Sequence, residues 1–79
     1  MTTYTVELTE IERACGVTLD QVAEHLPRVA VRGDRVFMPP ELSPALAGAV
    51  ARAALGGPVE FIRINTLGLL MYERMGVGA

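Results

Sequence analysis

The sequence predicts an α+β fold in which short helices precede a β-hairpin, a third helix and a C-terminal strand-helix extension. Two observations favour this fold class. A pair of helix-capping boxes lies between Thr9 and Leu26, and a two-residue turn, Gly33-Asp34, separates two segments of alternating apolar residues. The chain has 79 residues, of which 51% are hydrophobic, so we expect a single domain over residues 1–79 with a small core.

The first segments predict a strand and a short helix. Alternation from Thr3 to Val6 is typical of a strand. Thr9 and Glu12 have the spacing of the N-cap and N3 residues of a capping box, and Gly16 predicts the end of the helix. The expected buried face of this helix consists of Ile11, Ala14 and Cys15.

A second helix follows after a very short turn. Thr18 and Gln21 form the second capping box, and Pro27 ends the helical pattern. Apolar residues recur with helical spacing, so the expected buried residues are Leu19, Val22, Ala23 and Leu26. Two short helices joined by a Gly-containing turn are typical of a helix-turn-helix.

The hairpin centred on Gly33-Asp34 has the turn chemistry of type II′, with Gly first. This turn pairs Arg32 with Arg35, which places two like charges opposite each other. The face expected to be apolar contains Val29, Val31, Val36 and Met38. The other face contains Arg28, Arg32, Arg35 and Phe37. Such a hairpin is either a solvated loop or a cationic finger that contacts an anion.

The remaining sequence predicts a third helix, a strand and a fourth helix. Ser43 and Pro44 are typical of an N-cap and N1 pair, and Gly56-Gly57 ends the helix after Leu55. Its expected inner residues are Leu46, Val50 and Ala53. The β-branched segment 59–64 predicts a strand. Asn65 or Thr66 is then expected to cap a helix through Met75, so that residues 58–79 form a strand-helix extension.

The segments LTEIERACGVTLDQVAEHL and VRGDRVFMPPEL, within residues 4–55, resemble the winged helix-turn-helix of the MerR and phage-excisionase type. The resemblance implies that the second helix enters the DNA major groove and that the hairpin wing contacts the phosphates or the minor groove. The nucleic-acid contacts that it implies are Thr18, Gln21, His25, Arg28, Arg32 and Arg35. We therefore expect a small homo-oligomeric protein that binds double-stranded DNA as an architectural or transcriptional regulator.

The outward residues of the second helix favour an alternative. Asp20 and Glu24 would face the phosphates, and carboxylates there reduce affinity for DNA. The formal net charge of −2 also argues against non-specific nucleic-acid binding by the whole surface. The alternative is a winged-helix adaptor that binds another protein without DNA, similar to the MerR-like chaperone modulators or to a phage host-interaction protein.

No motif indicates catalysis, a metal site or a cofactor. The Gly56-Gly57 segment lacks the Lys of a phosphate-binding loop, and His25, the one histidine, has no Cys or second His at ligand spacing. The single Cys15 excludes an internal disulfide, and no segment has the length of a membrane span. We therefore expect a cytoplasmic protein that is not an enzyme.

The apolar C-terminal region predicts self-association. A small domain cannot bury every apolar side chain between Val59 and Met75, so part of this surface is expected to contact a second copy. The expected interface residues are Phe61, Ile62, Leu67, Leu70 and Met71.

Overall fold

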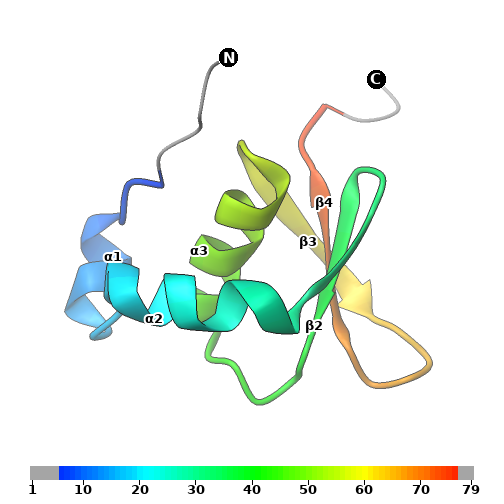
Figure 1. The fold of residues 1–79 in the computed structure, drawn as a ribbon, viewed down its shortest axis with the longest axis horizontal. Coiled ribbons are helices and arrows are strands. Elements are labelled where there is room, and N and C mark those ends of the chain that lie inside the picture. Colours follow the sequence, from blue (N-terminus) through cyan, green and yellow to red (C-terminus); the bar gives the residue numbers. More distant parts are fainter. Residues whose placement is uncertain (1–5, 77–79) are drawn as a thin grey trace.

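The computed structural model describes residues 6–76 and has an α+β architecture with three α-helices and a four-stranded antiparallel sheet (Figure 1). Helix α3 lies between the sheet and the pair α1–α2. The strand order is β1-β2-β4-β3. In chain order the elements are α1 (Glu10–Ala14), α2 (Leu19–His25), the 3-10 turn η1 (Leu26–Arg28), β1 (Ala30–Arg32), β2 (Arg35–Met38), α3 (Pro44–Leu55), β3 (Val59–Ile64) and β4 (Leu70–Arg74). Of the strand expected at the N-terminus, Thr3–Thr5 lie outside the described residues.

Both predicted capping boxes are confirmed. Thr9 Oγ1 accepts a hydrogen bond from the Glu12 amide at 3.1 Å, and Glu12 Oε1 accepts one from the Thr9 amide at 2.9 Å. Thr18 and Gln21 make the same reciprocal pair at the start of α2. These bonds satisfy N-terminal amides that have no partner within a helix.

The prediction for the buried face of α1 is wrong. Ile11 is 74% exposed, Ala14 and Cys15 are also exposed, and the residue that points inward is Glu12, which is only 6% exposed. The physical reason is that a five-residue helix is docked here by a charge pair rather than by an apolar stripe. Helical periodicity alone predicts that a Glu at this position faces solvent, because the sequence pattern does not show the distant residue that binds it.

That partner is Arg52 of α3. The guanidinium contacts the carboxylate at two points, with Nη1 donating to Oε2 at 2.8 Å and Nη2 to Oε1 at 2.7 Å. Arg52 Nη2 also donates to the Glu7 carbonyl oxygen at 3.2 Å. Two parallel charge-assisted bonds fix orientation as well as distance. The pair therefore fixes α1, and the chain before it, to the last turn of α3.

The prediction for α2 is correct for Val22 and wrong for Leu19. Val22 is 4% exposed and contributes to the core, whereas Leu19 is 55% exposed and Ala23 is also exposed. Val17, in the turn between the two helices, is 6% exposed and belongs to the same buried cluster as Val22. The helix therefore buries a narrower stripe than its sequence pattern predicts.

The predicted hairpin register is confirmed for Ala30 with Phe37, Val31 with Val36 and Arg32 with Arg35. Gly33 has φ 61°, and no non-glycine residue among residues 6–76 has a positive φ, which is the pattern of a type II′ turn. Val36 and Met38 are buried against α3. Val31 remains half exposed because β1 lies at the edge of the sheet.

The predicted C-terminal helix is wrong, since residues 70–74 form β4, between β2 and β3. Both faces of β4 are buried, since Met71 and Tyr72 point to opposite faces and are 4% and 8% exposed. Leu70–Tyr72 is therefore apolar without alternation and imitates an all-apolar helix. The turn before it is closed by Asn65, whose Oδ1 accepts hydrogen bonds from the amides of Leu67 and Leu69, while Gly68 has φ 82°. The helix face of Leu67, Leu70 and Met71, on which we expected the interface, therefore does not exist, and Met71 is only 4% exposed.

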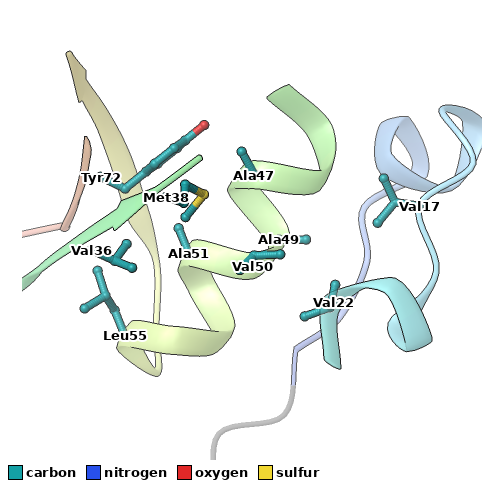
Figure 2. Packing of buried hydrophobic residues seen from close by; sticks show 10 residues of the cluster. All are labelled: Val17, Val22, Val36, Met38, Ala47, Ala49, Val50, Ala51, Leu55 and Tyr72. Carbon is teal, nitrogen blue, oxygen red and sulfur yellow. The ribbon is translucent and has the colours of Figure 1, made fainter. Parts of the chain in front are cut away.

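The core lies on both sides of α3 (Figure 2). Val36, Met38 and Tyr72 from the strands face one side of the helix, and Val17 and Val22 lie on the other. The small side chains of α3 are buried in between: Ala47, Ala49, Val50 and Ala51 are each 0% exposed. Alanines let the two layers approach the helix closely. Helix α3 extends from Pro44 to Leu55, as predicted, with Ser43 as its N-cap.

The Glu12 carboxylate predicts a pH dependence of stability. Its hydrogen bonds from Arg52 hold the pKa of Glu12 below its usual value of 4.5, although burial acts in the opposite direction. The unfolded chain therefore takes up this proton first as the pH falls, so the stability due to ionised Glu12 is present above about pH 4.5 and lost through the lower folded pKa. We expect the difference in unfolding free energy between the wild type and Glu12→Gln, measured by urea titration, to shrink below about pH 4.5. A difference that stays constant into strong acid would contradict this.

Gly48 predicts a stabilising substitution. It lies inside α3, and a Cβ there would meet Glu12 Oε2 at 3.9 Å, which is an ordinary contact. Glycine costs about 0.5–1 kcal/mol relative to alanine within a helix. Gly48→Ala should therefore raise the unfolding free energy by about that amount in urea denaturation. The matched control is Gly56→Ala, which should destabilise because Gly56 ends α3 with φ 71°.

Candidate functional site

The residues predicted to contact nucleic acid lie along one continuous segment from the start of α2 to the hairpin (Figure 1). Helix α2 leads through η1 directly into β1. The exposed members are Thr18, Gln21, Arg28, Arg32 and Arg35, while His25 is half-buried. The exposed side chains of α2 and of the hairpin are here together called the α2–hairpin surface.

Thr18 and Gln21 are engaged within the helix itself. The Gln21 side-chain oxygen accepts a hydrogen bond from the Thr18 amide at 2.9 Å, and Thr18 Oγ1 accepts one from the Gln21 amide at 3.2 Å. A glutamine that recognises adenine uses its oxygen and its NH₂ group together. Gln21 uses that oxygen to cap α2, so it can recognise adenine only after the capping hydrogen bond breaks.

His25 is held by the last turn of α2. Its Nδ1 lies 2.8 Å from the Gln21 carbonyl oxygen. A carbonyl oxygen only accepts, so Nδ1 carries the proton and Nε2 is the remaining ring nitrogen. Within residues 6–76, no group of three His, Cys, Asp or Glu side chains is placed to hold a metal ion.

The charges of the hairpin are partly neutralised by β4. Arg35 Nε donates to Glu73 Oε2 at 2.8 Å, directly across the β2–β4 pairing. At the turn, Arg74 Nε donates to Asp34 Oδ1 at 3.1 Å, and the Arg74 amide donates to the Asp34 carbonyl oxygen at 2.8 Å. The repulsion expected between Arg32 and Arg35 is therefore relieved by Glu73. The sequence gives no local signal for this contact, because the partners are separated by 38 positions.

The exposed charges of the α2–hairpin surface that make no ion pair among the described residues are equal in number and opposite in sign. Asp20 and Glu24 are exposed on α2, and Arg28 and Arg32 are exposed after it. None of these four side chains makes an ion pair among the residues that the structure describes. Two free carboxylates thus accompany two free guanidiniums. This surface lacks the positive excess that gives proteins their affinity for the phosphate backbone.

Leu19, like Ala23, is exposed on this surface although the sequence pattern assigns it to the core. It is 55% exposed, and it lines an open hollow of about 490 Å³ together with Val6, Leu8 and Arg13. Leu19 is the first residue of α2, directly after the N-cap. The periodicity of α2 alone could not show that this end of the helix projects beyond α3.

No protein-family model, curated protein or solved structure matches the chain. Among the helices within residues 6–76, none is long and apolar enough to cross a membrane.

Proposed function

We propose that this chain is a protein-interaction module whose α2 helix binds a basic segment of another protein. The order of α1, α2, the β1–β2 hairpin and α3 supports a winged helix-turn-helix as its framework. The observation that carries the proposal is the outward face of α2, where Asp20 and Glu24 are exposed without an ion pair among the described residues.

The spacing on α2 defines the kind of partner. Asp20 and Glu24 are four residues apart, so they lie on one side of the helix and repel each other by a few tenths of a kcal/mol. Leu19 and Ala23 have the same spacing and are also exposed. An apolar ridge therefore runs beside an acidic ridge. An amphipathic helix with Lys or Arg beside its apolar stripe complements both ridges and relieves the repulsion.

DNA binding is the second candidate, and Arg28 and Arg32 support it. Both guanidiniums are exposed, follow α2 directly, and have no ion pair among the described residues. In a winged arrangement they would contact phosphates on either side of a groove. The two carboxylates of α2 and the engagement of Arg35 by Glu73 oppose this function, so we rank it second.

Two binding titrations distinguish the candidates. One follows the fluorescence anisotropy of a labelled random-sequence duplex at low and at physiological ionic strength, and the other uses a labelled amphipathic Leu/Lys peptide. We expect the peptide to bind. The double variant Asp20→Asn/Glu24→Gln should bind the peptide about five- to tenfold more weakly, because two charge contacts are lost. Arg28→Ala with Arg32→Ala is the matched control and should leave peptide affinity unchanged.

The opposite pattern would overturn the proposal. Salt-sensitive duplex binding that is lost in the arginine variant and kept in the acidic-face variant would identify DNA as the ligand. Peptide affinity that is insensitive to Asp20 and Glu24 would also contradict it. Circular dichroism of each variant checks that α2 remains folded.

A further inference from the structure

Within residues 6–76, no strand covers the outer edge of β3. Strand β3 is the last in the order β1-β2-β4-β3, and it pairs with β4 alone. Three of its apolar side chains are exposed: Phe61 by 52%, Ile62 by 37% and Ile64 by 57%. An edge strand with unpaired backbone groups and apolar side chains is a template for another strand.

The charges of β3 lack partners within the described residues. Glu60 lies directly opposite Glu73 in the β3–β4 pairing, and Glu73 is already bound by Arg35. Arg63 lies opposite Met71. Neither Glu60 nor Arg63 makes an ion pair in residues 6–76. The strand therefore exposes one carboxylate and one guanidinium, and the carboxylate faces a like charge.

A bulge places these two charges on the same face of the sheet. The pairing register shifts between Phe61 and Arg63, so Ile62 is an extra residue. In a regular strand, positions 60 and 63 point to opposite faces. Here their partners on β4, Glu73 and Met71, are two residues apart and share a face, so Glu60 and Arg63 share it as well.

We propose that two copies of this chain pair through β3 in antiparallel orientation, around a two-fold axis between Phe61 and Ile62. In this register Glu60 lies opposite Arg63 of the second copy, and the symmetry makes the same pair again. Val59 then lies opposite Ile64 of the second copy, and Phe61 opposite its Ile62. The sheet continues across the interface as eight strands.

The bulge makes this register self-consistent. A two-fold axis perpendicular to a sheet leaves every side chain on its own face, so only residues that share a face lie opposite each other. Glu60 and Arg63 satisfy that condition because of Ile62, and without the bulge they would not. The pairing joins opposite charges, relieves the repulsion between Glu60 and Glu73, and covers the apolar side chains of the edge.

This inference does not depend on the proposed function. Strand β3 and the hairpin strand β1 lie at opposite edges of the sheet, and α2 packs on α3. A chain that dimerises without binding a basic peptide, or the reverse, separates the two.

Exchanging the charges at positions 60 and 63 tests the proposed pairing of two β3 strands. The readout is the molar mass, measured by sedimentation equilibrium over a concentration series. We expect wild-type dimers, and at least about a tenfold weaker dimer for Glu60→Arg or Arg63→Glu alone, because each places like charges opposite each other twice. The double variant Glu60→Arg/Arg63→Glu restores opposite charges and should dimerise like the wild type. An equimolar mixture of the two single variants should also form dimers, since one chain then presents two arginines and the other two glutamates.

Three results would overturn the inference. These are a wild type that stays monomeric at the highest concentration reached, single variants that dimerise as well as the wild type, and single variants that do not associate when mixed. Glu24→Arg is the matched control, because it makes the same charge change on α2 and should leave the dimer intact. Circular dichroism verifies that each variant is folded. The mixture is a second control for folding, because the two single variants can form a mixed dimer only if both chains are folded.

Discussion

The position of the helix pair depends on the ion pair between Glu12 of α1 and Arg52 of α3. Helices α1 and α2 contribute little apolar surface of their own, since Val17 and Val22 are the buried hydrophobic residues of the segment from Glu10 to His25. The Glu12 carboxylate is almost fully buried and its oxygens are all bonded, which offsets the cost of removing the charge from water. A buried pair of this kind fixes orientation more than it adds stability.

Helix α3 transmits that orientation to the rest of the fold. It contacts α1 and α2 on one side and β2, β3 and β4 on the other. The buried side chains of the core pack on the two sides of α3. The outward face of α2 and the outer edge of β3 are therefore not covered by other described residues. The two surfaces for which we propose partners therefore arise from the same packing arrangement.

Local rules predicted much of this structure, and long-range contacts account for what they missed. The capping boxes at Thr9 and Thr18, the hairpin register and helix α3 each depend on residues within a few positions of one another. The inward turn of Glu12 depends on a residue 40 positions away. Strand β4 has the sequence pattern of a helix because its side chains are buried on both faces of the sheet, which leaves no alternation. In the candidate site, the sequence located the exposed charges of α2 and of the hairpin but not the Glu73 that neutralises Arg35.

The most direct test of the central role of the Glu12–Arg52 pair is a double-mutant cycle in urea denaturation, with Glu12→Gln, Arg52→Met and the double variant. If the pair docks α1 on α3, Arg52→Met should cost about 3 kcal/mol because it leaves a buried charge without its partner. The double variant should then cost clearly less than the two single variants together, with a coupling of about 1–3 kcal/mol. Additive costs, with no coupling between the two positions, would contradict the account.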